Sequence, residues 1–478
     1  MLDTQPRCEG RHSNGHTGAG KRSLEDKIAD RTAQIAVLGL GYVGLPLAAA
    51  FAQAGYRVIG VDVDEERVAS LAAGKSHIRD VSEDDLSPHV ESGRLTATVD
   101  CDVLRTVDAL FICVPTPFDA QRTPDLSFIE SASETIRSRL RRGQLVVLQS
   151  TTYPGTTEEV VLPILEKSGL KAGVDFFLGF SPERVDPGNK RWTAYNTPKV
   201  VGGVTPDSTR LTADLLRQMG ALVHPVSSTR AAEMAKLLEN TFRAVNIALV
   251  NELALIAERM KIDLWEVIEA AKTKPFGFMP FYPGPGVGGH CIPVDPHYLS
   301  WKAREYDFYT KFIALAAEVN EAMPYHVVEL VTESLSRGRI PLNGAQVLVM
   351  GVAFKPGVED ARNSPATRVI ELLLNRGAQV SYHDPYVPQF QVGNDVFHRA
   401  NVVLDSVPLT DEVLASADCV VIVTGHPDVD YRHIVDHAPR IVDSCNATAA
   451  VAGGGENTLR LGAPLPVNLT DRPLGSSS

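Results

Sequence analysis

An apolar strand followed by spaced glycines and a helix constrains this chain more than any other feature. The strand covers residues 34–38, and the glycines are Gly39, Gly41 and Gly44 in the sequence GLGYVG. A helical segment runs from 45 to 54, and a second strand, 57–61, ends at Asp62. This order is typical of the first βαβ unit of a doubly wound parallel sheet. It predicts a Rossmann-like α/β domain, and the alternative is a glycine-rich turn without a ligand.

The same turn predicts a dinucleotide cofactor. The glycines allow close approach of a pyrophosphate, and Tyr42 and Val43 lie between them at the positive end of the helix dipole. Asp62 would accept hydrogen bonds from ribose hydroxyls and repel a 2′-phosphate, which favours NAD over NADP. Arg67, about one helical turn further on, either contacts the adenosine phosphate or is a solvated surface arginine.

Length and charge set the class of protein. With 478 residues the chain is too long for one core, so two or three domains are expected. A net charge of −12 argues against a nucleic-acid surface. The six cysteines are scattered without a CxxC pair, which argues against zinc and disulfide frameworks and fits a reducing cytoplasm. No apolar run is long enough to span a membrane, and the N-terminal residues lack the apolar core of a signal peptide.

Further strands of the first domain end in polar loops. Strands at 109–114 and 145–149 precede Thr116 and the segment containing Ser150 and Thr151. Loops at strand C-termini line the cofactor crevice of a doubly wound sheet, so these residues are expected near the nicotinamide; the alternative is ordinary turn-forming threonines. A strand at 176–180 leads into a charged loop with Glu183 and Arg184, which taken alone is a surface turn.

A long helical segment, residues 228–260, follows the first domain. It is apolar on most sides, which predicts burial between domains or at a subunit interface. Glu233, Lys236, Asn240 and Arg243 share one narrow face. A buried lysine is costly unless it is paired or functional, and the alternative here is a Glu233–Lys236 salt bridge. A second helical region, 297–336, should kink or break at Pro324.

The segment 284–296, GPGVGGHCIPVDP, is too rich in glycine and proline for a helix or strand. It predicts a shaped loop whose glycines approach a ligand and whose Cys291 is a candidate nucleophile. The alternative is a glycine-rich turn with a buried structural cysteine.

A second βαβ pattern without the dinucleotide fingerprint begins at residue 345. Lys355, Asp360 and Arg362 in its first loop suit the diphosphate of a nucleotide, and the alternative is a purely structural domain. The fold class expected is therefore α/β, with two Rossmann-like doubly wound domains joined by a long central helix and a helical middle domain. The expected divisions are a disordered extension (1–30), an NAD-binding domain (31–227), the central helix and helical middle domain with the cysteine segment (228–340), a second Rossmann-like domain for another nucleotide (341–450) and a flexible tail (451–478).

Taken together, these motifs resemble the UDP-glucose/GDP-mannose dehydrogenase family from residue 34 to 446. The motifs are GLGYVG with Asp62, STTYPG, SPERVDPGN, KLLENTFR, GPGVGGHCIPVDP and FKPGVEDARNSP. The resemblance implies four-electron oxidation of the C6 hydroxyl of a nucleotide-bound hexose, with two NAD⁺ and no metal. It implies a homodimer through the central helix.

The resemblance also implies roles for individual residues. Cys291 would form a thiohemiacetal and then a thioester, which water oriented by Asp295 would hydrolyse. Lys236 and Asn240 would stabilise oxyanions, Lys236 would lower the pKa of Cys291, and Glu183 and Thr151 would position or deprotonate water. The expected cofactor contacts are Gly39, Gly41, Tyr42, Val43, Gly44, Asp62, Arg67, Thr116, Ser150, Thr151 and Arg362. The expected substrate contacts are Glu183, Arg184, Lys236, Asn240, Arg243, Tyr282, Gly286, Gly288 and Lys355.

The sequence of segment 284–296, which we call the cysteine loop, indicates the substrate. His290 and Val294 stand where members acting on UDP-glucose or GDP-mannose carry serine and lysine, so the chain is closer to the UDP-N-acetylhexosamine branch. Pro293 favours UDP-N-acetylglucosamine over UDP-N-acetylmannosamine, and the N-acetylgalactosamine form stays open. Asn363 departs from the glutamate frequent in relatives. The remaining alternatives are a UDP-glucose enzyme, a two-electron hydroxyacid dehydrogenase, which would leave Cys291 without a role, and a non-enzymatic nucleotide-sugar sensor.

Overall fold

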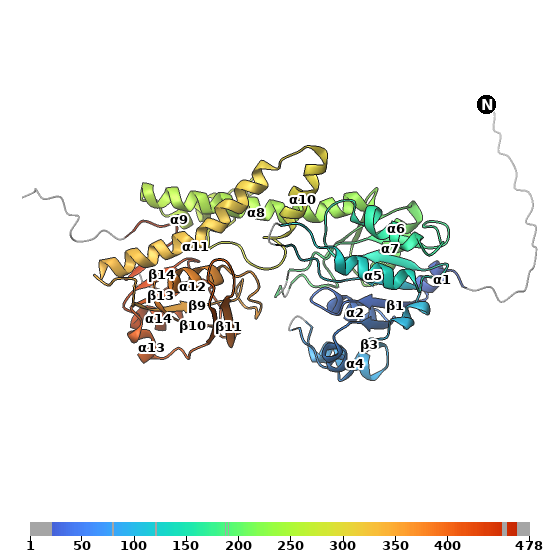
Figure 1. The fold of residues 1–478 in the computed structure, drawn as a ribbon, viewed down its shortest axis with the longest axis horizontal. Helices are drawn as coiled ribbons and strands as arrows, with labels where there is room; N and C mark the ends of the chain where they lie inside the picture. Colours follow the sequence, from blue (N-terminus) through green and yellow to red (C-terminus); the bar gives the residue numbers. More distant parts are fainter. Residues whose placement is uncertain are drawn as a thin grey trace, which may run out of the picture.

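The computed structural model describes residues 22–78, 81–119, 122–186, 188–189, 191–451 and 457–465. Figure 1 shows two α/β units side by side, bridged along one side by the long helices α8 (Thr229–Met260) and α11 (Lys311–Arg337). This confirms the predicted fold class of two Rossmann-like units joined by a central helix and a helical middle region.

The first unit is built on an eight-stranded sheet in the order β3-β2-β1-β4-β5-β6-β7-β8. The strands are parallel except that β7 runs antiparallel to β6. Along β1, Ile35 and Val37 pack into one apolar cluster while Ala36 and Leu38 pack into another, because alternate side chains of a strand face opposite sides. The strands are β1 (Gln34–Leu38), β2 (Arg57–Val61), β3 (Leu95–Thr98), β4 (Ala109–Ile112), β5 (Leu145–Leu148), β6 (Phe177–Phe180), β7 (Lys199–Gly203) and β8 (Val223–Pro225).

The strand order of this sheet reverses at β1, with β2 on one side and β4 on the other. The crevice beyond the C-terminal ends of β1 and β4 is therefore the place where such a sheet binds a ligand. The helical segments of this unit are α1 (Leu24–Ala29), α2 (Gly44–Gln53), α3 (Glu65–Ala72), α4 (Glu83–Glu91), η1 (Cys101–Arg105), α5 (Ser127–Arg137), η2 (Thr157–Val161), α6 (Leu162–Glu166) and α7 (Pro206–Arg217).

The second unit has a parallel five-stranded sheet in the order β10-β9-β13-β14-β15. Its elements are β9 (Gln346–Met350), α12 (Pro365–Asn375), β10 (Gln379–His383), α13 (Asp411–Ser416), β13 (Cys419–Ile422), α14 (Tyr431–His437), β14 (Ile441–Asp443) and β15 (Thr458–Arg460). An antiparallel pair, β11 (Gln389–Gly393) with β12 (Asn401–Asp405), extends beside it. The sequence patterns did not predict this pair.

The central helix matches its predicted bounds. Ser228 caps α8 by accepting a hydrogen bond from the Ala231 N–H at 3.2 Å, and the helix ends where Lys261 takes a left-handed conformation. The middle region continues with α9 (Leu264–Lys272), α10 (Asp295–Ala303) and η3 (Arg304–Tyr306) before α11.

Of the kink or break expected at Pro324, the break is wrong, because α11 runs through Pro324. The helical region is interrupted instead at residues 307–310, after the short 3₁₀ helix η3. Proline leaves the carbonyl of residue i−4, here Asn320, without its helical donor. The loop glycine Gly286 lies against that carbonyl, because a β-carbon on Gly286 would come within 3.0 Å of the Asn320 oxygen. The cysteine loop thus packs against the turn of α11 in which the Asn320 carbonyl has no helical donor.

Two predicted boundaries also need correction. Residues 24–29 of the expected disordered extension form α1, whose Ile28 is buried and accepts a hydrogen bond from the Tyr56 hydroxyl at 2.8 Å. Residues 458–460 of the expected flexible tail form β15, the edge strand beside β14. Short amphipathic segments of this kind are stabilised by tertiary contacts that a local pattern does not contain. Residues 1–21 and 466–478 lie outside the described residues.

Across the part of the chain that the structure describes, none of the helices combines the length and the apolar character that crossing a membrane requires.

Candidate functional site

The glycine turn after β1 has two glycines that packing requires and one that it does not. Gly39 has a φ of +89°, and a β-carbon there would lie 2.6 Å from the Cys113 carbonyl oxygen. A β-carbon on Gly44 would lie 1.8 Å from the Gly39 oxygen. A β-carbon on Gly41 would have no atom within 4 Å. Gly39 and Gly44 therefore shape the turn, whereas the open space at Gly41 is available for a pyrophosphate.

The surroundings of the turn fit a dinucleotide. Val43, the N-cap residue of α2, has no side chain that could accept a hydrogen bond from the first N–H groups of the helix. No capping side chain therefore competes with a phosphate for these N–H groups. Asp62 is buried, and its carboxylate accepts hydrogen bonds from Leu40 N–H at 2.7 Å and Asp64 N–H at 3.0 Å. Arg67 lies against Asp62 and Asp64 at 3.7 and 3.2 Å. The structure thus places Asp62 and Arg67 together beside the glycine turn.

The loops after β4 and β5 lie at the other end of this crevice. The Ser150 hydroxyl donates to the Val114 carbonyl at 2.7 Å, which joins the two loops. The Thr116 carbonyl accepts a hydrogen bond from the Tyr298 hydroxyl of α10. Thr151 follows Ser150 and is half-buried. The predicted nicotinamide-side residues therefore sit where the crevice meets α10.

The cysteine loop brings together the residues predicted to react. Cys291 ends the loop, and its carbonyl accepts the Asp295 N–H at 2.8 Å where α10 begins. Asn240 of α8 donates to the Asp295 carboxylate at 2.5 Å. Lys236 lies on α8 one turn before Asn240, buried, and its charge acts on both Asp295 and Cys291. Three of these side chains are buried and the thiol is half-buried; we call Cys291, Lys236, Asn240 and Asp295 the cysteine cluster.

Burial dominates the electrostatics of the cysteine cluster. It raises the pKa of Cys291 to about 11, and the Asp295 carboxylate adds to this rise. Lys236, Arg362 and Arg243 oppose it. Lys236 therefore lowers the pKa of the thiol as expected, but the larger effect of burial leaves the net shift upward. Burial also raises the pKa of Asp295 to about 6, against the charge of Lys236 and the hydrogen bond from Asn240.

The glycines of the cysteine loop allow it to lie against the second unit. A β-carbon on Gly288 would meet Phe354 at 2.8 Å and the Asn363 carbonyl at 2.9 Å. Gly289 donates to the Arg362 carbonyl, and its own carbonyl accepts from the Asn363 side chain, both at 3.1 Å. Asn363 has a φ of 51°, a conformation that asparagine tolerates better than glutamate. The departure at Asn363 therefore ties the cysteine loop to the second unit.

Arg362 connects both units and the cysteine loop. Its guanidinium binds Asp360 through contacts of 2.6–3.1 Å and lies 4.8 Å from the ring centroid of Tyr42 in the glycine turn. Its Nη2 is 3.4 Å from His290 Nδ1. Burial and the Arg362 charge lower the pKa of His290, which favours a neutral ring. The structure thus places Arg362 beside the glycine turn.

Glu183 is held as a carboxylate away from the cysteine loop. It accepts hydrogen bonds from Lys199 at 2.9 and 3.0 Å, from Gln149 at 3.0 Å, and from the Arg184 and Val185 N–H groups. Burial opposes its ionisation, but Lys199 and these hydrogen bonds hold its pKa below the usual range. A carboxylate so tightly bound is a poor base, so the geometry favours a positioning part for Glu183 over deprotonation of water.

Other predicted substrate residues have partners within the chain. Arg184 forms a two-point contact with Glu239 of α8, at 2.6 and 3.2 Å, and Lys355 joins Asp186 of the first unit at 2.7 Å. Tyr282 lies against α9, where it stacks on Trp265 and donates to Glu269 at 2.7 Å. The structure does not bring Tyr282 into the cysteine cluster.

Two further predicted residues differ in position. Arg243 is exposed on α8, about two helical turns after Lys236, and its charge acts on Cys291. The alternative Glu233–Lys236 salt bridge is wrong, because Glu233 accepts hydrogen bonds from Gly155 N–H at 2.6 Å and from Thr157 N–H and Oγ1 at 2.9 and 2.6 Å.

Sequence reasoning missed three supporting residues. Lys199, which is completely buried, was hidden at the start of an apolar strand, and the signal was its charge next to VVGG. Asn251 of α8 accepts the Gly284 N–H and donates to Asn320 of α11, both at 2.9 Å. Two buried asparagines in otherwise apolar helices were the available signal. Together they fix the start of the cysteine loop.

Comparison with known protein families agrees with these features. Residues 33–220 match the NAD binding domain of the UDP-glucose/GDP-mannose dehydrogenase family, 230–322 its central domain and 348–450 its UDP binding domain. The fold and the glycine turn therefore define an NAD-binding oxidoreductase. The chain belongs to the UDP-glucose/GDP-mannose dehydrogenase family.

Individual relatives cover most of the chain. UDP-N-acetyl-D-glucosamine 6-dehydrogenase of Pseudomonas aeruginosa is 38% identical over 83% of this chain and 91% of its own length. UDP-N-acetyl-D-mannosamine dehydrogenase of Pyrococcus horikoshii is 39% identical over 83% of this chain and 90% of its own. A solved structure of UDP-D-ManNAc dehydrogenase from Pyrococcus horikoshii superposes with a TM-score of 0.82 at 35% identity, covering 91% of this chain and all of that one.

The free space at Gly41 generates a test of the cofactor site. Gly41→Ala is expected to leave the melting temperature nearly unchanged and to weaken NAD⁺ binding by about tenfold or more, because a methyl group would occupy the approach of the pyrophosphate. Titration calorimetry with NAD⁺ measures the affinity. Gly44→Ala is the contrasting variant, expected to lower the melting temperature because its β-carbon meets the Gly39 carbonyl. Unchanged NAD⁺ affinity in Gly41→Ala would contradict the assignment.

Proposed function

We propose that this enzyme oxidises the C6 hydroxyl of UDP-N-acetylglucosamine to a carboxylate, a four-electron oxidation with NAD⁺ as acceptor. The observation that carries the proposal is the cysteine cluster. Its lysine and asparagine come from α8 and its carboxylate from the start of α10. Its thiol lies on the cysteine loop, which packs between the glycine turn and the second unit. The match of that unit to a UDP binding domain supports a nucleotide-linked substrate.

The first oxidation turns the C6 alcohol into an aldehyde. NAD⁺, when bound, accepts the hydride that each oxidation removes. The hydroxyl proton must pass to a base at the same time, and the Asp295 carboxylate, ionised at neutral pH, is the acceptor proposed. Buried Lys236 is suited to stabilise the developing oxyanion because a charge acts strongly where water is excluded. Asn240 adds an N–H donor while it holds Asp295 in place.

The second oxidation depends on Cys291. Its sulfur adds to the aldehyde carbon, and the carbonyl oxygen takes up a proton, giving a thiohemiacetal. Loss of a hydride from that carbon and of the hydroxyl proton gives a thioester. Water then attacks the thioester carbon, the carbon–sulfur bond breaks, and the products are the carboxylate and the regenerated thiol. The addition of the cysteine converts the trigonal aldehyde carbon into a tetrahedral carbon that carries a hydroxyl group. A hydride can leave that carbon as it leaves an alcohol.

A thiol with a raised pKa needs a base for this addition. Asp295 meets that need, because its own pKa of about 6 leaves it ionised at neutral pH and yet closer in basicity to the groups it serves than an ordinary aspartate. The same carboxylate is proposed to orient the hydrolytic water. Thr151, at the nicotinamide end of the crevice, is proposed to help position that water, and Glu183 to support it through Gln149.

The relatives and the sequence of the cysteine loop bear on the identity of the sugar. The Pseudomonas aeruginosa relative and Pro293 in the cysteine loop favour UDP-N-acetylglucosamine. UDP-N-acetylmannosamine is the second candidate, favoured by the Pyrococcus horikoshii relative. The free cysteines support a reducing compartment, the cytoplasm.

The stoichiometry of NADH release tests both the chemistry and the substrate. We expect two NADH per UDP-N-acetylglucosamine at 340 nm, and little turnover of the mannosamine, galactosamine and glucose nucleotides run in parallel. Cys291→Ala should lower turnover by roughly a thousandfold or more. Cys101→Ser, at a half-buried cysteine in η1, is the matched control and should retain activity. One NADH per sugar would overturn the thioester route, whereas two NADH with another sugar would overturn only the substrate.

The raised pKa of Asp295 predicts the pH dependence. Burial moves this pKa from 3.8 to about 6, so the carboxylate is lost as pH falls through 6, and kcat/KM should decline there. Asp295→Asn should remove that limb of the profile and lower kcat by about 10²–10⁴-fold. A pH profile that keeps the limb in Asp295→Asn would assign it to another group.

The raised pKa of Asp295 affects stability in the opposite direction to activity, because the ionised carboxylate that the proposed catalysis requires destabilises the fold. A carboxyl whose pKa is higher in the folded state destabilises the fold as pH rises from about 4 to 6. At about pH 8 Asp295→Asn should therefore raise the free energy of unfolding, by up to about 3 kcal/mol, measured by urea denaturation. Asp207→Asn, on the exposed face of α7, is the control and should change it little.

We also propose that two copies associate through α8. Large apolar side chains are exposed along this helix at spacings of three, four and seven residues: Leu238, Phe242, Leu249, Leu253, Ile256 and Met260. A continuous apolar stripe on a soluble helix favours a partner of the same character, and a second copy of α8 supplies it.

Sedimentation velocity tests the association. The protein should sediment as a dimer, and Leu249→Glu with Leu253→Glu should shift it towards the monomer, because two charges would enter the apolar stripe. Val174→Glu, at a side chain that is 82% exposed on the first unit, is the matched control and should remain dimeric. A dimer that survives both glutamates would place the interface elsewhere.

A further inference from the structure

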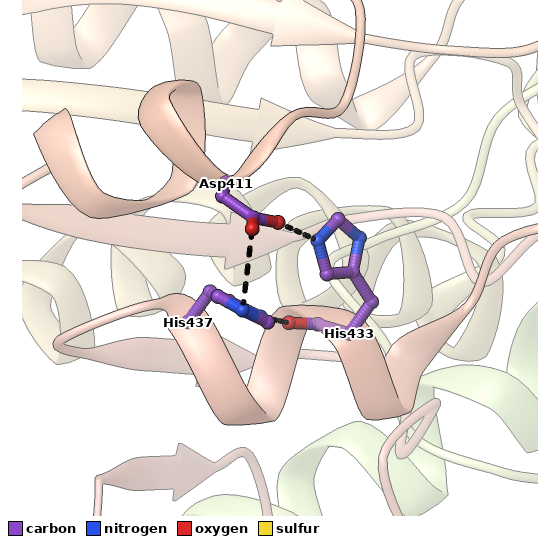
Figure 2. Close-up of side chains that lie close together, drawn as sticks. All are labelled: Asp411, His433 and His437. Atoms are coloured by element: carbon purple, nitrogen blue, oxygen red, sulfur yellow. Dashed lines mark hydrogen bonds and ion pairs between the residues drawn. The ribbon is translucent and has the colours of Figure 1, made fainter.

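Three metal-ligating side chains converge on the outer surface of the second unit. Figure 2 shows Asp411 of α13 directed at the imidazoles of His433 and His437, which project from the same face of α14. Their ligand atoms lie within 4.8 Å of one another. Figure 1 places α13 and α14 on the side of this unit away from the first unit, so the group is separate from the cysteine cluster.

The distances suit a small cation between the three groups. Asp411 Oδ1 is 2.6 Å from His433 Nε2, and Oδ2 is 3.6 Å from His437 Nε2. Ligand atoms around a tetrahedral zinc ion, each about 2.1 Å from the metal, are about 3.4 Å apart. The two observed separations bracket that value, so small side-chain rotations would suffice to admit the ion.

The hydrogen bonding of His437 leaves its Nε2 atom available as a metal ligand. Its Nδ1 is 2.9 Å from the His433 backbone carbonyl, which can only accept, so Nδ1 carries the proton of the neutral ring. The lone pair then lies on Nε2, the atom that faces Asp411. Metal-bound histidines commonly donate their other N–H to a backbone carbonyl in this manner, which orients the ring before the ion binds.

The scaffold holds the three residues in register. Leu414 of α13 and Ile434 of α14 are both buried in the apolar cluster on one face of the second sheet. Asp430 caps α14 by accepting the N–H groups of Arg432 and His433, and Thr410 caps α13. The core and the caps therefore fix the separation of the two helices independently of the surface side chains.

We propose that Asp411, His433 and His437 form a zinc site that joins α13 to α14. Two imidazoles and one carboxylate are a ligand set that zinc accepts, whereas magnesium and calcium prefer oxygen ligands. The side chains of Asp411, His433 and His437 are 66%, 25% and 39% exposed, so an ion can enter from solvent and complete its coordination with water. This zinc site takes no part in the proposed oxidation, and the proposal does not depend on that reaction.

A hydrogen-bonded Asp–His pair without metal is the competing explanation, and metal binding separates the two. Chelator-treated full-length protein without an affinity tag would be titrated with Zn²⁺ and, in parallel, Mg²⁺ by calorimetry. We expect one Zn²⁺ per chain beyond any bound by thiols, and no Mg²⁺. The variant His433→Gln/His437→Gln should lose that one ion, while His398→Gln, at another histidine of the same unit, should keep it.

Thermal unfolding provides a second readout that a misfolded variant cannot imitate. Zn²⁺ should raise the melting temperature of the wild type and of His398→Gln by several degrees, and leave the double variant unchanged. The circular dichroism spectrum and NADH formation of the double variant should match the wild type, which shows that it is folded. Equal zinc stoichiometry in wild type and double variant, or no binding by the wild type, would overturn the proposal.

Discussion

The buried polar groups of helix α8 are the constraint on which the rest of the structure depends. A polar side chain inside an apolar helix is tolerated only if a partner satisfies it. On α8 those partners come from different segments: Glu233 holds the loop after β5, Asn240 holds the start of α10, and Asn251 holds the first residue of the cysteine loop. One helix of 32 residues, about 48 Å long, therefore fixes the positions of three loops.

The electrostatics of the cysteine cluster follow from the same burial. Removing Cys291 and Asp295 from water raises the pKa of both, and a single lysine only partly offsets the effect. The thiol is therefore mostly protonated at neutral pH. Arg362 depends on the closeness of the two units, because it contacts Tyr42 of the first unit and His290 of the cysteine loop from its position in the second.

Much of this arrangement could be predicted from the sequence, and the failures have physical causes. The two sheets, the bounds of α8 and the meeting of Lys236, Asn240, Cys291 and Asp295 follow from strand and helix periodicity and from ordered motifs. The partners of Glu183, Arg184 and Lys355 could not be predicted, because they lie 16, 55 and 169 residues away along the chain. The thiol pKa required the extent of burial, which no local pattern contains. His433 and His437, at helical i, i+4 spacing, are a sequence signal for a metal site that the spacing of the cysteines does not contain.

The last described strand has a consequence for how the protein is made. Residues after β14 return to the end of α8: Leu461 accepts the indole N–H of Trp265, Gly462 binds Glu258 and Leu264, and Arg460 pairs with Asp263. These contacts join positions about 200 residues apart, and loop closure of that length is slow. During synthesis the first unit and most of α8 emerge well before these residues exist. The junction between the end of the central helix and the edge strand β15 can therefore close only after residues 460–462 have been synthesised, which makes it a late contact in folding rather than an early one.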